Sequence, residues 1–352
     1  MAVGKNKKST GKNEFNQEMK SVSLTADAWK RLQKNKMAYI SFWVVMAYLL
    51  ISLFAPLLPL HPYEKQNVNH ANLPPSFRSA GAVELDVRKA YFDKVAAKEG
   101  RSSYSAKEQE ELDAIAARNA SDPEQKYHYW LGTDSLGRDM LSRTIYGGRI
   151  SIMIGVIGTI TALIIGIIVG AVSGYAGGWV DTLLMRIVDI MYGLPYMLIV
   201  IIMMAILGKS TAILFVAIAL VSWLTIARVV RGQVMSLKNT EYILAARSMG
   251  AGTWHIIIHH LIPNTLGIII AYTALSLPSF IMSESFLSFL GLGVSAPLAS
   301  WGSLISDGVQ GMGLYPWCLL VPAAAMTVFL FAMNFLGDGV RDAFDPQSKN
   351  RV

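Results

Sequence analysis

Residues 150–172 read ISIMIGVIGTITALIIGIIVGAV, a stretch of 23 residues without a charged side chain. An α-helix needs about 20 consecutive apolar residues to cross the hydrocarbon core of a bilayer, which is roughly 30 Å thick. Small residues also recur every four positions at Gly166, Gly170 and Gly174, a spacing that lets a neighbouring backbone approach closely. The stretch therefore predicts a membrane-spanning helix that packs against a second helix.

The rest of the chain follows the same pattern. Hydrophobic residues make up 53% of the 352 residues, charged residues make up 16%, and the mean hydropathy is +0.40. A soluble domain has about 25% charged residues, so two soluble domains are excluded although the length would allow them. We expect an all-α, polytopic membrane protein with six transmembrane helices. The expected spans are roughly 37–60, 150–172, 190–207, 211–229, 266–282 and 317–336.

The distribution of charge predicts the orientation. The net charge is +7, and nine of the 31 Lys and Arg residues precede residue 37. Basic segments next to membrane spans stay in the cytoplasm, so we expect both termini to be cytoplasmic. No basic helix with interleaved aromatic residues follows, which argues against a nucleic-acid partner. The first apolar run lies behind this long polar tail and lacks a cleavage site, so we read it as an uncleaved anchor.

We expect five segments along the chain. They are a cytoplasmic tail with an amphipathic elbow helix on the membrane lipid (1–36), a first transmembrane helix (37–60), an extracytoplasmic insertion (61–146), a five-helix transmembrane domain (147–338) and a cytoplasmic tail (339–352). The elbow helix begins near Ser23. Within the insertion, Ser105 and Glu108 form a capping box that predicts a helix.

Motifs for catalysis and metal binding are weak. Gly208-Lys-Ser-Thr211 resembles the end of a phosphate-binding loop, but Met203 occupies the position of its first glycine and no strand precedes it. His255, His259 and His260 lie close together without the glutamate of a zinc-hydrolase motif. Cys318 is the only cysteine, which excludes an internal disulfide. We expect no catalytic site, no metal and no cofactor bound by this chain.

Glu284 lies at the outer end of the fifth expected span, next to an apolar run. A carboxylate in such a position is a candidate for a functional role. Carboxylates inside a membrane are functional candidates, and we consider an outer gate or pore position. The alternative is that Glu284 lies at the interface and hydrogen-bonds Ser283, Ser285 or the helix that follows.

Three stretches resemble a known family. They are WLGTDSLGRDMLSRTIYGGR at 130–149, LSFLGLG at 287–293 with SWG at 300–302, and NFLGDGVRDAFDP at 334–346. All three resemble motifs of the C-type permeases of oligopeptide and dipeptide ABC importers. The resemblance runs from about residue 24 to 347, except for residues 62–126, and it implies a type I ABC importer permease fold in the bacterial plasma membrane.

A fourth stretch resembles the loop by which such permeases contact their ATPases. The family pattern is Glu-Ala-Ala, three residues, Gly, nine residues, Ile, one residue and Leu-Pro. Here Leu244, Ala245, Ala246, Gly250 and Pro263 stand in that frame, within a coupling loop at 230–265. Leu244 replaces the glutamate, and Glu241 is a displaced acidic candidate.

The residue types of this loop suit a docking helix. We expect the small side chains of Ala245 and Ala246 to enter a groove on a partner. We expect Gly250 to form a bend, and Pro263 to set the start of the fifth span.

The resemblance implies a transport function without catalysis in this chain. A second B-type permease, two cytoplasmic ATPases that bind ATP and Mg, and an extracytoplasmic substrate-binding protein are the implied partners. The implied substrate is a short peptide, and a nickel or metal-chelate permease is the alternative. A channel would not need the ATPase-docking loop. A membrane-embedded hydrolase would need facing catalytic groups in the spans, and the sequence contains none.

Overall fold

The computed structural model describes residues 24–344, so residues 1–23 and 345–352 lie outside it. Most of the basic tail and the end of the carboxy-terminal motif fall in those outer segments. Between residues 24 and 344 the regular elements are helices, with one isolated β-bridge between Thr133 and Asp139. The all-α fold predicted from the sequence is confirmed. The helices are α1 (Leu24–Lys34), α2 (Lys36–Phe54), α3 (Ala80–Glu99), α4 (Ala106–Ser121), α5 (Met140–Ala176), α6 (Gly178–Gly193), α7 (Tyr196–Leu207), α8 (Thr211–Ser222), α9 (Leu224–Leu237), α10 (Glu241–Ser248), α11 (Thr253–Ile256), α12 (Ile262–Phe289), α13 (Trp301–Gln310) and α14 (Trp317–Phe344).

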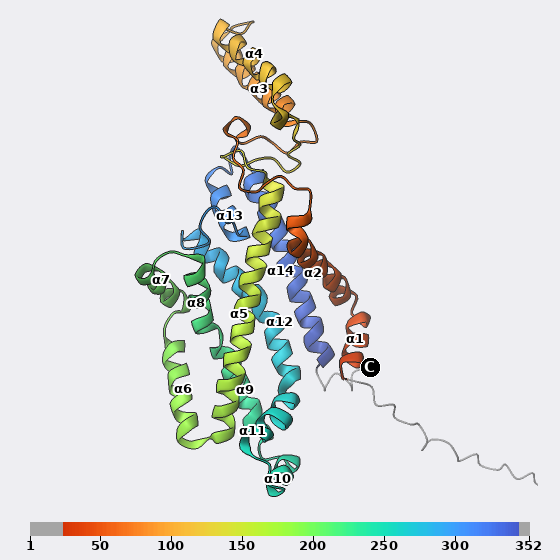
Figure 1. Cartoon of the computed structure of the whole chain (residues 1–352), viewed down its shortest axis with the longest axis vertical. Coiled ribbons are helices and arrows are strands. Elements are labelled where there is room, and N and C mark those ends of the chain that lie inside the picture. The colour runs from red at the N-terminus through yellow and green to blue at the C-terminus, as the bar shows by residue number, and fades with distance from the viewer. Residues whose placement is uncertain (1–23, 345–352) are drawn as a thin grey trace, which may run out of the picture.

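Five helical segments of the described chain are long and apolar enough to cross a membrane. They are Lys36–Leu57, Met140–Ala176, Thr211–Leu237, Thr253–Phe289 and Trp317–Phe344. The bent pair α6 and α7 makes a sixth if it is taken as one span. Figure 1 shows α10 at one end of the molecule and the α3–α4 hairpin at the other, with α1 beside the end of α14 that points away from the hairpin.

The third predicted span, 190–207, is wrong as a continuous helix. Helices α6 and α7 meet at a break with an angle of 83°. Pro195 causes the break because it has no N–H to donate and pushes the preceding residue out of the α region. Leu194 accordingly has extended dihedrals of φ −91° and ψ 132°. With 16 and 12 residues, the two helices measure about 24 and 18 Å, so neither spans the bilayer alone.

Helix α5 packs along α9, and the three glycines at four-residue spacing face that helix. A Cβ on Gly166 would lie 2.6 Å from the Ile226 Cβ, and one on Gly170 would lie 2.5 Å from the Ala227 carbonyl oxygen. A Cβ on Gly174 would meet the next turn of α9. The close backbone approach predicted from the spacing is therefore confirmed.

The insertion folds into a helical hairpin outside the bundle. Helices α3 and α4 pack on each other and project away from the spans (Figure 1). The predicted capping box is present, because the Ser105 hydroxyl accepts a hydrogen bond from Glu108 N and the Glu108 carboxylate accepts one from Ser105 N. Away from this hairpin, the elbow helix α1 buries Ala28 and Leu32 and packs against α14.

Candidate functional site

The segment predicted to couple to an ATPase forms α10 at one end of the molecule. Glu241 is the first residue of this helix, where a negative charge is favourable beside the positive end of the helix dipole. Gly250 has a φ of +85°, a conformation that side chains disfavour, and Ala251 N donates to Ala246 O across the turn at 3.0 Å. The bend expected at Gly250 is present.

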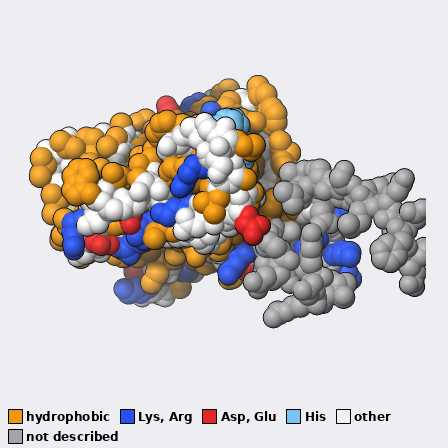
Figure 2. All heavy atoms as spheres, turned by 90° about the horizontal axis from the view of Figure 1, so that it is seen from below, with side chains coloured by type: hydrophobic (Ala, Val, Ile, Leu, Met, Phe, Trp, Pro, Cys, Tyr) orange, Lys and Arg blue, Asp and Glu red, His pale blue; other side chains and the backbone are white. Residues whose placement is uncertain are grey.

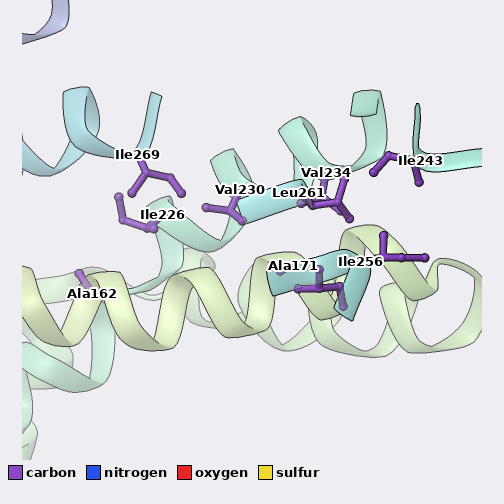
Figure 3. Close-up of a cluster of buried hydrophobic side chains, with 10 residues drawn as sticks. Ala162, Ala171, Ile226, Val230, Val234, Ile243, Ile256, Leu261 and Ile269 are labelled. Carbon is purple, nitrogen blue, oxygen red and sulfur yellow. The ribbon is translucent and has the colours of Figure 1, made fainter. Parts of the chain in front are cut away.

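The two faces of α10 differ sharply in burial. Ile243 is fully buried and Ala246 is 5% exposed, and both face the body of the same chain. Figure 3 shows Ile243 in a buried apolar cluster with Val234 of α9 and Ile256 of α11. Leu244 is 45% exposed, and Ala245 is exposed as well. Of the two alanines expected to enter a partner's groove, only Ala245 is therefore available, because Ala246 packs inside the chain.

Further apolar side chains extend the exposed face of α10. Met249 is 82% exposed at the turn after the helix, and Trp254 on α11 is 61% exposed. Figure 2 shows this end of the molecule, where Lys and Arg side chains lie among apolar ones. A surface that combines exposed apolar residues with surrounding charge is typical of a protein-binding site.

Pro263 is the second residue of α12, as expected, although the helical segment that is long enough to cross a membrane already begins at Thr253. The chain is helical from Thr253 onward, and the turn Ile257–Leu261 is a π-helix that leads directly into α12. A π-turn is a common way for a helix to accommodate a disturbance of its hydrogen-bond ladder, and Pro263 lies just after it without an N–H to donate. The three histidines lie on this segment, with the rings of His255 and His259 stacked at 4.4 Å.

Glu284 lies inside the protein and not beside water. Its carboxylate is fully buried, and Oε1 accepts hydrogen bonds from Ser288 and Ser300, each at 2.6 Å. Oε2 has no partner within residues 24–344. Ser300 is the N-cap of α13, so Glu284 ties α12 to the helix that follows, as the alternative reading held. The protein shields the carboxylate from solvent.

The neighbourhood of Glu284 is a junction of three helices. Trp301 N donates to the Ser151 hydroxyl of α5 at 3.0 Å, and the Trp301 indole N–H donates to Thr144 O at the same distance. The resemblance motif at 300–302 therefore holds α13 against α5. In this arrangement, Glu284 holds α12 and α13 together through its hydrogen bonds.

The first half of the motif at 130–149 forms a tight turn before α5, and the second half is the first part of that helix. One Asp134 oxygen accepts from Leu136 N and Arg138 N at 2.9 Å, and the other accepts from the Arg143 guanidinium at 2.5 Å. Asp139 caps α5 by accepting from Ser142 N at 3.0 Å. A buried charge is stable only when it is paired and hydrogen-bonded, and these contacts satisfy that condition.

The turn is anchored to the loop that precedes the hairpin. The Thr133 hydroxyl accepts from Leu73 N at 2.8 Å and donates to His70 O at 2.5 Å. His70 is fully buried beside the Tyr129 hydroxyl, and this burial lowers the pKa of the imidazole. The motif therefore serves to fix the amino-terminal end of α5.

Comparison with known proteins identifies the family. Residues 162–350 match the family described as binding-protein-dependent transport system inner membrane component. The chain belongs to this family. Residues 23–75 match the N-terminal transmembrane domain of oligopeptide transport permease C. The permease fold expected from the motifs is confirmed.

Several relatives of this permease are similar over most of their length. It is 38% identical to the dipeptide transport system permease protein of Bacillus subtilis over 328 residues, 93% of this chain and 87% of the relative. It is equally identical to the oligopeptide transport system permease protein of the same organism, over 91% of that relative. The oligopeptide transport system permease protein of Salmonella typhimurium is 48% identical over 65% of this chain and 76% of its own.

The sequence reading missed the break at Leu194–Pro195 and the inward face of Ala246. A proline within an apolar run was the available signal for the first, and the spacing of Ile243 and Ala246 on one helical face was the signal for the second.

Proposed function

We propose that this chain is a transmembrane permease subunit of an ABC importer for oligopeptides or dipeptides in the bacterial inner membrane. The observation that carries the proposal is the 38% identity to a dipeptide and to an oligopeptide permease over nearly the whole chain. The alternative of a nickel or metal-chelate permease has no such support, because the relatives compared are named for peptides.

In this proposal, α10 is the contact to a cytoplasmic ATPase. The exposed apolar surface of α10 consists of Leu244, Ala245 and Met249. Ile243 on its inward face packs in the buried apolar cluster. Motion imposed on α10 by a nucleotide-driven partner then passes to α9 and α5 through packed side chains, because such contacts resist deformation. ATP and Mg bind to the two ATPases, and this chain is not itself an enzyme.

The remaining partners follow from the two ends of the molecule. A B-type permease completes the translocation path, and an extracytoplasmic substrate-binding protein delivers the peptide at the end that carries the α3–α4 hairpin. Figure 1 shows α10 at the end of the molecule opposite this hairpin, and it shows α1 and the end of α14 at the ends of their spans that point away from the hairpin, which supports a common cytoplasmic side for these three elements.

Uptake by the purified complex tests the function. The permease, its B-type partner, the two ATPases and the binding protein are reconstituted in vesicles that contain ATP. We expect uptake of radiolabelled tetraalanine to require ATP, and we expect no uptake of radioactive nickel. Uptake of nickel without uptake of any peptide between two and five residues would refute the proposal.

Thiol labelling tests the orientation. In a Cys318→Ser background, single cysteines replace Ser103 near the tip of the hairpin and Ser236 on α9, both of which are exposed. We expect an impermeant reagent added to intact cells to label the first cysteine and not the second. The reverse result would invert the proposed topology.

A further inference from the structure

A cavity of about 630 Å³ lies among the helix breaks of the membrane domain. Residues of α6, α7, α8, α9 and α12 line it, among them Tyr192, Pro195 and Thr225. Its volume lies within the range of about 300–1,000 Å³ that is usual for small-molecule sites. No residue of the ATPase-coupling surface or of the Glu284 junction takes part in it.

A break in helical structure lies at this cavity. Helices α6 and α7 meet at Leu194 and Pro195, and both residues line the cavity. Irregular backbone at membrane depth is tolerated only where it is buried in protein or lines a water-filled cavity. The break at Pro195 must therefore be covered by protein or face water, and the cavity beside it offers the second of these environments.

One face of α12 adds a row of hydroxyl groups. Tyr272, Ser276, Ser279 and Ser283 follow one another at intervals of four, three and four residues, which places them on one side of the helix. The Ser276 hydroxyl donates to Tyr272 O at 2.8 Å, and the Ser283 hydroxyl donates to Ser279 O at 2.8 Å. Because each serine donates to its own helix, its oxygen lone pairs stay free to accept from a ligand.

The opposite wall supplies further polar atoms. The Tyr192 and Thr225 hydroxyls lie 2.6 Å apart and join α6 to α9. The buried Tyr196 hydroxyl has no hydrogen-bond partner in the described part of the chain. A buried hydroxyl without a partner is unfavourable by about 1–3 kcal/mol, so a ligand that bonds to it would gain stability.

The lining combines many hydroxyls with no charge. Half of the lining residues carry a hydroxyl group, and none of the described lining residues is Asp, Glu, Lys, Arg or His. A hydroxyl both donates and accepts, so it suits the alternating N–H and C=O groups of a peptide backbone. A neutral surface also does not discriminate strongly between acidic and basic side chains.

We propose that this cavity is the surface through which the subunit contacts the backbone of the peptide during translocation. The α12 hydroxyl row and Tyr196 are its contact residues. The proposal rests on the proposed transport of peptides and adds the residues and the chemistry by which the chain holds its substrate. It predicts a surface exposed to water and covered by peptide, in contrast to a face covered by lipid or by the second permease.

Single-cysteine accessibility tests this inference in the assembled transporter. Ser279→Cys and, separately, Ser276→Cys are placed in the Cys318→Ser background and reconstituted with all partners in nanodiscs. The control is Ile168→Cys, since Ile168 is 55% exposed on α5 and does not line the cavity. We expect a cationic methanethiosulfonate reagent to modify the two α12 cysteines at least tenfold faster than the control.

Substrate protection then tests the backbone contact. With binding protein and ATP present, tetraalanine and tetralysine should each slow modification of the Ser279→Cys variant at least threefold, at concentrations that saturate uptake. Modification as slow as that of the control would overturn the inference and indicate a face covered by lipid or protein. Protection by only one of the two peptides would overturn the role of the backbone. The proposed function is tested by a separate experiment, which measures uptake by the wild-type complex.

Discussion

Neighbouring residues of α10 offer a sharp test of how the permease is coupled. Ile243 and Leu244 are both branched aliphatic side chains on one short helix, but Ile243 is fully buried in the chain and Leu244 is 45% exposed. Truncation of each to alanine removes a similar apolar volume from the two opposite faces. The inward face should affect the stability of the permease, and the outward face should affect the binding of the ATPase.

The expected magnitudes follow from burial. Truncation of a fully buried isoleucine to alanine costs about 2–5 kcal/mol, and α10 has few other buried side chains to hold it. Ile243→Ala should therefore loosen the whole helix. Leu244→Ala should change the stability of the permease by less than about 0.5 kcal/mol, since Leu244 is not part of the core.

Two measurements separate the variants. Hydrogen exchange over residues 241–251 should rise strongly in Ile243→Ala and stay unchanged in Leu244→Ala. Retention of the ATPases on the purified permease should fall in both variants, but only Leu244→Ala should keep the normal fold.

Ala245→Trp tests the same outward face by adding a large side chain. Overpacking of a fitted groove costs about 1–3 kcal/mol, which corresponds to roughly 5- to 150-fold weaker docking.

The reasoning is refuted if Leu244→Ala and Ala245→Trp both retain the ATPases and transport normally, because the outward face would then not be the docking surface. Ala246→Trp does not serve this purpose. Its side chain would enter the core of the same chain, so a loss of ATPase binding would not separate docking from folding.

Three further perturbations follow from the structure. Gly170→Ala should destabilise the permease by about 1–3 kcal/mol in thermal unfolding, because the added methyl group would meet the backbone of α9. The control is Gly232→Ala, because no atom lies within 4 Å of the added methyl group. This control should stabilise the permease by up to about 1 kcal/mol. Glu284→Ala should lower the stability of the permease by about 1–3 kcal/mol for each serine hydroxyl left without a partner. Glu284→Gln should lower the stability less. A stable Glu284→Gln variant that does not transport would support the hypothesis that Glu284 acts as an outer gate. Because burial lowers the pKa of His70, the unfolded chain binds a proton there more readily, so stability should fall as the pH drops below the unfolded value near 6.5. His70→Asn should flatten that part of the pH profile of the unfolding temperature.

The sequence predicted those features that depend on hydrophobic length and local chemistry. The apolar runs gave the fold class because a spanning helix must be long and uncharged, as residues 150–172 are. The glycine spacing on α5 gave its close approach to α9, and the Ser105–Glu108 pair gave the start of α4. Each of these depends on residues close together in the chain, so no knowledge of the tertiary fold was needed.

The sequence could not predict which face of a short helix points inward. The family pattern marks Ala245 and Ala246 as equally small, but only Ala246 lies on the side of Ile243, three residues before it. The choice depends on Ile256 and Val234, which reach α10 from other helices. The burial of Glu284 could not be predicted for the same reason. Its hydrogen-bond partner Ser300 is 16 residues away and belongs to another helix.

The break at Pro195 connects these observations to transport. A continuous third span would satisfy its own backbone hydrogen bonds along its whole length. The structure instead has two short helices at 83°, opposite the hydroxyl row of α12. Below this break, α6 is tied to α9 by polar contacts, including an ion pair of Arg228 with Asp189 at 2.6 Å. The same α9 carries Val234, which packs in the apolar cluster that holds Ile243 of α10. Helix α9 thus connects the proposed docking helix to the wall of the proposed peptide cavity, and we expect that a displacement of α10 by its partner also displaces this wall.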